Sequence, residues 1–180
     1  WLSRGRRPRL PDPTCKSGPA MATYAFVTVD VFTTQRFGGN PLAVFPDARG
    51  LSDAQMQALA NELNLSETTF VLPPDDPANT ARVRIFNRTH EMPFAGHPNV
   101  GTAFVLAQQQ RDKGGVLRFE EIAGLVEIAV ARDAAGAVTG ATIAAPQPLA
   151  LGPCLPADAI AACAGLEGVD VIVAAHKPVQ

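Results

Sequence analysis

The strongest constraint on the fold is a run of apolar residues that follows His97. Pro98 comes next, and proline suits the first position of a helix because its missing N–H has no helical partner there. Residues 100–107 then carry apolar side chains on nearly every face of the predicted helix, which indicates burial on all sides. Such a helix must be surrounded by other elements. The apolar runs that can surround it are predicted strands at residues 24–32, 42–45, 68–72, 81–86, 116–119, 125–131 and 138–144.

A second helix is predicted to lie against the surface of the same domain. Ser52 is a favourable N-cap, and Gln55, three residues later, completes a capping box. The predicted helix ends near Asn64. Only one of its faces is apolar, which is typical of a helix packed on a domain rather than inside it. That face consists of Met56, Leu59, Ala60 and Leu63.

Composition excludes several classes of protein. The chain has 180 residues, of which 47% are hydrophobic and 18% charged, so it is neither disordered nor fibrous. No apolar run reaches the roughly 18 residues of a membrane-spanning helix, and no membrane association is predicted. The three cysteines, Cys15, Cys154 and Cys163, are odd in number and lack the spacing of a zinc site. Free thiols of this kind favour a reducing, cytoplasmic location.

The chain is predicted to have three parts. Residues 1–20 contain five basic side chains, one acidic side chain and four prolines, and we expect a disordered basic extension ahead of a start at Met21. Residues 21–145 form the domain of strands around the apolar helix, and 146–180 begin as a linker. Within the last part, a helix is predicted at 156–166 and a strand at 169–174. Residues 21–180 carry ten basic and sixteen acidic side chains, which argues against binding to nucleic acid.

Two residues stand out as candidates for chemistry. Glu67 lies between an apolar helix end and an apolar strand, where partial desolvation raises the pKa of a carboxyl towards values useful for proton transfer. A surface acid at a strand edge is the alternative. His97 lies at the predicted start of the buried helix, where free N–H groups and the helix dipole favour an anion and Gly96 permits close approach. The alternative for His97 is a simple helix cap.

No metal site is predicted. His90, Glu91 and His97 are close in sequence, but Pro93 interrupts the single helix on which a zinc-binding helical motif depends. The sequence also lacks a glycine-rich phosphate loop and a serine-nucleophile elbow.

Four segments in order resemble the PhzF family of phenazine-biosynthesis-like isomerases, which share the diaminopimelate epimerase fold. Each segment alone is a weak signal, but the ordered set is specific, and it is densest between residues 29 and 107. The segments are Val29-Asp30-Val31-Phe32 with Gly39-Asn40-Pro41-Leu42-Ala43-Val44-Phe45; the run from Met56 through Asn64-Leu65-Ser66-Glu67-Thr68-Thr69-Phe70-Val71; Arg84-Ile85-Phe86; and Glu91-Met92-Pro93-Phe94-Ala95-Gly96-His97-Pro98 with Gly101-Thr102-Ala103.

The resemblance implies an α+β fold of two similar halves, each a mixed sheet rolled around a central buried helix, with the active site between them. It implies that Glu67 is the catalytic acid/base and His97 a second catalytic residue. The reaction implied is relocation of a proton on a small unsaturated carboxylic acid without a cofactor. No cysteine stands at the helix start, which argues against thiol-based racemisation. The residues implied in substrate binding are Asn40, Ser66, Gly96, Pro98 and Asn99.

The sequence also departs from the family pattern. It stops at Gln180, inside what would be the second half, and lacks the aspartate and Gly-Ser pair expected there; Asn87-Arg88 replaces the usual Thr-Pro. We therefore expect these 180 residues alone not to turn over substrate. We also expect the chain to self-associate, either by aggregation or as a homodimer. Two alternatives remain open: a non-catalytic interaction module or fragment of this family, and an epimerase of a small acid on the same fold.

Overall fold

The structure is a computed structural model that describes residues 22–148, 150 and 152–170. The predicted extension at 1–20 lies outside the described residues. The helices are α1 (Asp53–Leu63), α2 (Gly96–Gln108) and α3 (Ala157–Cys163), with a short 3₁₀ turn at Gly168–Asp170. The strands are β1 (Val27–Val31), β2 (Asn40–Phe45), β3 (Glu67–Leu72), β4 (Ala81–Phe86), β5 (Glu91–Met92), β6 (Val116–Glu121), β7 (Gly124–Arg132) and β8 (Val138–Ile143).

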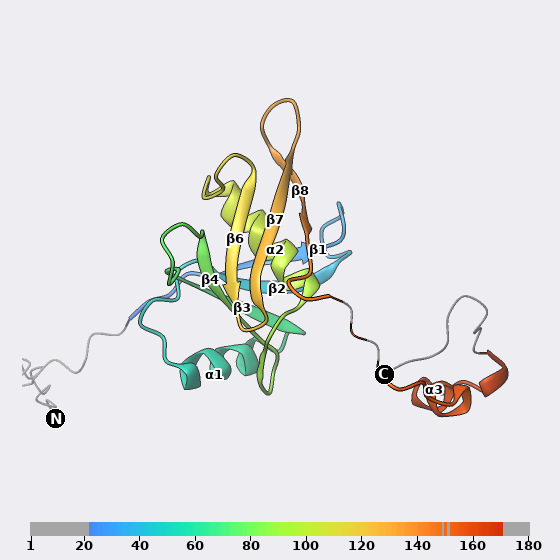
Figure 1. Ribbon diagram of the computed structural model, residues 1–180. Helices are drawn as coiled ribbons and strands as arrows, with labels where there is room; N and C mark the ends of the chain where they lie inside the picture. The colour runs from blue at the N-terminus through green and yellow to red at the C-terminus, as the bar shows by residue number, and fades with distance from the viewer. Residues whose placement is uncertain (1–21, 149, 151, 171–180) are drawn as a thin grey trace, which may run out of the picture.

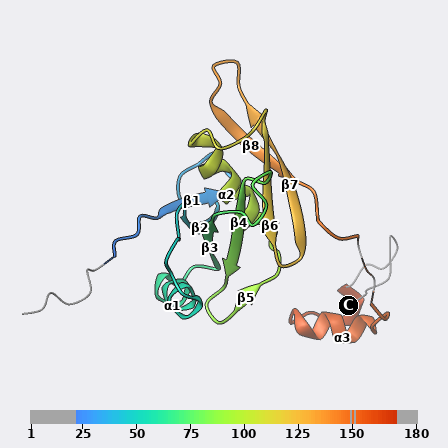
Figure 2. The ribbon, with the colours of Figure 1, turned by 60° about the vertical axis from the view of Figure 1, so that its left-hand side comes forward.

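Within the described residues, eight strands form one mixed sheet that is rolled around α2 (Figures 1 and 2). The strand order is β1-β2-β3-β4-β6-β7-β8, with β5 paired to β4. The β2–β3 and β4–β6 pairs are parallel, and the other pairs are antiparallel. Helix α2 contacts β1, β2, β3, β7 and β8, so both ends of the sheet reach it. The predicted α+β fold, a mixed sheet rolled around a buried helix, is confirmed.

The inner core fills the space between the sheet and α2. Leu106 of α2 is fully buried there, together with Ile85 of β4 and Phe119 of β6. Gly101 lets the helix approach the sheet closely, since a Cβ atom at this position would lie 2.7 Å from Leu42 Cδ2 and 2.8 Å from Val31 Cγ2. The apolar pattern around the helix thus has a direct structural cause: most of its residues are buried against the sheet, and Val100 and Phe104 are half-buried along a groove between β1 and β8.

A second core lies on the other face of the sheet, under α1. Met56 and Ala60 of the helix are buried against phenylalanines of β2, β3 and β4. The predicted capping box is present, because Ser52 Oγ accepts from the Gln55 N–H and the Gln55 side chain accepts from the Ser52 N–H. The helix ends at Asn64, whose φ of 55° places it in the left-handed region that closes helices. The aromatic rings in contact on this face are Phe26, Phe45 and Phe70, which are stacked, and Phe86, which meets Phe70 edge to face.

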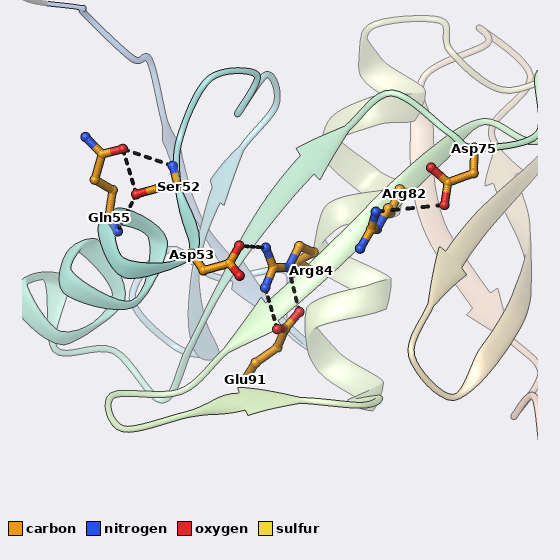
Figure 3. A network of polar contacts seen from close by, with 7 residues as sticks. All are labelled: Ser52, Asp53, Gln55, Asp75, Arg82, Arg84 and Glu91. Atoms are coloured by element: carbon orange, nitrogen blue, oxygen red, sulfur yellow. Dashed lines mark hydrogen bonds and ion pairs between the residues drawn. The ribbon is translucent and has the colours of Figure 1, made fainter.

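One arginine joins α1, β4 and β5 (Figure 3). Arg84 of β4 donates through Nε to Glu91 Oε1 at 2.7 Å and through a second nitrogen to Glu91 Oε2. Its third nitrogen donates to Asp53, in the first turn of α1. The Arg84 and Glu91 side chains are only 13% and 22% exposed, so the paired charges are partly withdrawn from solvent. Glu91 begins the segment that leads into α2, and the pair therefore fixes the approach to that helix.

The structure differs from the sequence predictions at several boundaries. The N-cap of α2 is Ala95, and the helix begins at Gly96 rather than after His97, so Pro98 occupies the third helical position. The first strand begins at Val27 instead of residue 24. The two-residue strand β5 was not predicted from the sequence. Of the strand predicted at 169–174, residues 169–170 belong to the 3₁₀ turn and the rest lies outside the described residues.

Candidate active site

Glu67 is the first residue of β3, at the end of the sheet where β2 also begins. The two strands are parallel, and Glu67 pairs with Leu42, the third residue of β2. Just before this pair, Ser66 Oγ donates to Asn40 Oδ1 at 3.2 Å. Three of the predicted site residues are therefore neighbours, although Asn40 and Glu67 are far apart in the sequence.

His97 stands opposite Glu67, in the first turn of α2. Its Nε2 lies 3.3 Å from Glu67 Oε2, and the two side chains are 10% and 17% exposed. The two atoms are within ion-pair distance but are not aligned as a hydrogen bond, and neither has another hydrogen-bond partner among the described residues. The structure thus brings the two predicted catalytic residues together, and the two facing atoms are both buried.

The electrostatics favour a neutral imidazole at His97. Burial lowers the pKa of His97 below its usual 6.5, because the charged ring loses hydration. The nearby Glu67 carboxylate and the Pro41 carbonyl oppose this effect by favouring the protonated ring, but burial dominates. A neutral His97 can accept or donate a proton beside Glu67, as acid–base chemistry requires.

A buried pair of hydroxyls holds the strand of Glu67 against the helix of His97. Thr69 Oγ1 of β3 and Thr102 Oγ1 of α2 are 2.8 Å apart, and both residues are fully buried. Thr69 follows Glu67 by two residues, about 7 Å along a strand. Thr102 follows His97 by five residues, about 7.5 Å along a helix. Strand and helix therefore touch at two matched points, one of which is the Glu67–His97 contact.

The first turn of α2 offers a place for an anion. The backbone N–H groups of Gly96 and His97 lie in the turn where a helix provides no acceptor, at the positive end of the helix dipole. A Cβ atom at Gly96 would meet nothing within 4 Å, so the backbone is open to approach. Pro98 has no N–H, and the Asn99 N–H donates to the Ala95 carbonyl at 3.4 Å. The capping alternative for His97 is wrong, because Ala95 is the N-cap.

Asn99 and Glu121 each have buried polar side-chain atoms. Asn99 is fully buried, and its side-chain amide favours the charged form of Glu121, the last residue of β6. Burial raises the pKa of Glu121 to about 7. Sequence reasoning missed Glu121, although the signal was present: Leu117, Phe119 and Glu121 alternate on one face of a strand, and the first two are core residues.

A groove of about 860 Å³ runs between β1, α2 and β8. Val29, Phe104 and Ala141 are among the residues that line it, and neither Glu67 nor His97 does.

In the described part of the chain, no three His, Cys, Asp or Glu side chains gather as metal ligands. None of the helices in this part is long and apolar enough to cross a membrane.

Comparison with known proteins places the chain in a family. Residues 29–175 match the family of phenazine biosynthesis-like proteins, PhzC–PhzF, over most of the chain. The chain belongs to that family. The resemblance read from the motifs is thereby confirmed, and the matched region includes Glu67, His97 and Glu121.

Several curated relatives carry the names of isomerases. An uncharacterized isomerase of Mesorhizobium japonicum is 50% identical over 133 residues, which cover 73% of this chain and 44% of the relative. The trans-2,3-dihydro-3-hydroxyanthranilate isomerase of Pseudomonas aeruginosa is 41% identical over 146 residues, covering 81% of this chain and 50% of the relative. The chain thus spans about half the length of the curated relatives it matches.

Solved structures agree with the fold. A predicted epimerase of Pseudomonas aeruginosa has a TM-score of 0.71 at 32% identity, covering 87% of this chain and 55% of that protein. A Bacillus anthracis phenazine biosynthesis protein of the PhzF family has a TM-score of 0.66 at 27% identity, covering 85% of this chain and 50% of that protein. The rolled sheet with its central helix is therefore a family feature.

Proposed function

We propose that this chain supplies the Glu67 half of the active site of an isomerase that relocates a proton on a small unsaturated carboxylic acid. The observation that carries the proposal is the Glu67–His97 contact: Oε2 and Nε2 are 3.3 Å apart, partly desolvated and free of other partners among the described residues. The isomerase names of the relatives support the same class of reaction.

In the proposed reaction, Glu67 moves the proton. Its carboxylate takes a proton from a carbon next to an unsaturated system, and the electron pair of the broken C–H bond shifts into that system. The protonated Glu67 then returns the proton to another carbon on the same face, where a new C–H bond forms. Atoms and electrons balance within the substrate, so the step needs no cofactor. Neutral His97 orients the substrate and exchanges a proton with its polar group.

Binding of the substrate carboxylate is assigned to the first turn of α2. The N–H groups of Gly96 and His97 and the helix dipole stabilise a negative charge there. Asn40 and Ser66, joined by their own hydrogen bond, lie at the neighbouring strand ends and contact the rest of the substrate. We propose trans-2,3-dihydro-3-hydroxyanthranilate, named in the relatives, as the first compound to assay. The wall opposite Glu67 comes from the part of the relatives that this chain does not match.

The experiment is a hybrid enzyme. Residues 29–145 of this chain replace the matching residues of the Pseudomonas aeruginosa isomerase, which supplies the opposite wall. We expect the hybrid to isomerise trans-2,3-dihydro-3-hydroxyanthranilate, and Glu67→Gln to lower kcat by about 10²–10⁴-fold, the range for loss of a general acid or base. Glu62→Gln, at an exposed position of α1, is the matched control and should leave kcat unchanged. A folded hybrid that is inactive, or one that is insensitive to Glu67→Gln, contradicts the proposal.

A second candidate is epimerisation of a small acid, favoured by the similarity to the predicted epimerase of known structure. In that reaction the proton returns to the same carbon from the opposite face, which requires a second acid or base across the cleft. Product stereochemistry distinguishes the two reactions: isomerisation moves a double bond, whereas epimerisation inverts one centre and leaves the bonds in place.

A further inference from the structure

A pocket of about 500 Å³ lies at the opposite end of β2, β3 and α2 from the candidate active site. The parallel strands β2 and β3 begin beside the site and end at this pocket, where Pro46 and Leu72 line one wall. Helix α2 also begins at the site, and its 13 residues span about 20 Å before the chain reaches Gln109 and Arg111, which line another wall. The pocket is therefore separate from the site proposed above.

Arg111 is placed at the pocket by the way α2 ends. Its backbone N–H donates to the Leu106 carbonyl at 3.1 Å, and the Gln110 N–H donates to the Ala107 carbonyl at 3.0 Å, a pattern that closes helices. Gln110 has a φ of 58°, in the left-handed region that such an ending uses. The Arg111 side chain extends from this fixed backbone to the Pro46 carbonyl, to which its Nη1 donates at 3.2 Å.

The charge of Arg111 has no ion-pair partner among the described residues. The residue is half-buried, and burial lowers the pKa of its guanidinium because the charge loses hydration. The Asp47 carboxylate opposes this effect, but it is bound by Arg49 through two hydrogen bonds. By contrast, the other half-buried arginines in the described part of the chain, Arg84 and Arg118, each pair with a glutamate.

One edge of the Arg111 guanidinium is available to a ligand. The planar group carries several N–H donors, and the bond to the Pro46 carbonyl is the one that its side chain makes within the described residues. Its Nε and Nη2 are not shut off from solvent. Two N–H groups side by side are the arrangement that grips both oxygens of a carboxylate, or two oxygens of a phosphate.

The rest of the pocket suits an organic molecule rather than a bare ion. Val71 and Leu72 give it an apolar wall, and Gln109 adds an amide that can both donate and accept. Its volume of about 500 Å³ lies within the range of small-molecule sites. The Asp47 and Arg49 charges cancel each other, so Arg111 leaves the pocket with a net positive charge.

We propose that this pocket binds a small organic anion. The Nε–Nη2 edge of Arg111 holds its carboxylate or phosphate, and Val71 and Leu72 contact its apolar body. The proposal does not depend on the isomerase function proposed above, because none of its residues belongs to that site.

NMR titration of the 180-residue chain at constant ionic strength and pH tests the proposal with four probes. Benzoate and phenyl phosphate carry a ring, whereas acetate and inorganic phosphate present the same two head groups without one. We expect the Arg111 Nε–H signal and the amides of Gln109 and Leu72 to shift saturably with a ring-bearing probe. Its ringless counterpart should bind about tenfold more weakly, because it buries less apolar surface. The tighter of the two ring-bearing probes identifies the head group.

Three variants assign the binding to Arg111. Arg111→Met keeps much of the apolar stem but removes the charge and the donors, and should weaken binding about tenfold or more. Arg111→Lys keeps the charge without the planar fork and should also bind more weakly than the unsubstituted chain; it carries the test if Arg111→Met does not fold. Arg88→Met removes an exposed arginine and should leave binding unchanged.

Four results would overturn the proposal. They are the absence of a saturable shift at the pocket in a folded chain, equal affinity for ringless and ring-bearing probes, unchanged binding in both Arg111 variants, and equal weakening in Arg88→Met. Shifts at Gly96 and His97 would instead report the first turn of α2, and they should persist in Arg111→Met. None of these readouts depends on turnover, so they stay interpretable if the proposed isomerase activity fails.

Discussion

The buried hydroxyl pair between β3 and α2 allows a quantitative test of how the site is held. Thr69 Oγ1 and Thr102 Oγ1 are 2.8 Å apart, and the only other hydrogen-bond partner of Thr69 Oγ1 in the described residues is the Ala43 carbonyl at 3.5 Å, which is long for a hydroxyl. Thr102→Val therefore leaves Thr69 poorly satisfied, and should cost about 1–2 kcal/mol of unfolding free energy. Thr69→Val should cost less, about 0.5–1 kcal/mol, because a helical threonine can turn its hydroxyl to a carbonyl of the preceding turn.

The double variant completes a thermodynamic cycle. With both hydroxyls replaced by methyl groups of the same shape, no buried group is left without a partner, so the double variant should be more stable than the sum of the single effects by about 1 kcal/mol. Urea unfolding of the four proteins at one pH, with a shared slope, measures this coupling. Strict additivity within about 0.3 kcal/mol would refute the bond, and with it the argument that the hydroxyl pair clamps Glu67 to His97.

Three further outcomes are expected. Leu106→Ala should lower the unfolding free energy by about 2–5 kcal/mol in urea melts, because it opens a cavity in the inner core; a loss below about 1 kcal/mol would place α2 at the periphery. Arg84→Met should lower the unfolding free energy by about 1–3 kcal/mol, because it leaves the mostly buried Glu91 carboxylate without its partner. Adding Glu91→Gln to this variant should restore part of the lost stability; no recovery would mean that the unpaired charge is not the cause. NMR titration of the His97 ring should give a pKa below 6.5, so the stability contributed by the neutral ring is present above that pH and lost as pH falls. Glu67→Gln should lower the His97 pKa further, and a rise would contradict the inference that the Glu67 carboxylate favours the protonated ring.

Sequence patterns correctly predicted the elements that are determined by residues close together in the chain. The burial of α2 follows from apolar residues on all its faces, and the start of α1 follows from Ser52 and Gln55, whose capping box is confirmed. The start of α2 was misplaced because Ala95 has no capping side chain, and the bond that replaces a cap comes from Asn99, inside the helix. Strand β5 has two residues, and pairing with β4 rather than any intrinsic preference defines it.

The candidate site depends on contacts that no local pattern contains. Glu67 and His97 could each be singled out, but their contact depends on the parallel pairing of β2 with β3 and on the packing of α2. The sequence pattern alone did not exclude the alternative that Glu67 is a surface acid at a strand edge. Glu121 was within reach of the period-2 pattern of β6, yet the pattern does not reveal that both of its carboxyl oxygens are buried without a hydrogen-bond partner among the described residues. The roles assigned to Asn40, Ser66, Gly96, Pro98 and Asn99 in substrate binding stay predictions.

The central claim is that a small carboxylic acid binds at the first turn of α2, beside Glu67 and His97. Amide and side-chain NMR of the chain, titrated with the carboxylate substrate proposed above, tests it most directly. The account predicts that the amides of Gly96 and His97 and the His97 ring shift together and saturably. Shifts confined to the groove lined by Val29, Phe104 and Ala141, or no saturable shift at all, would contradict it.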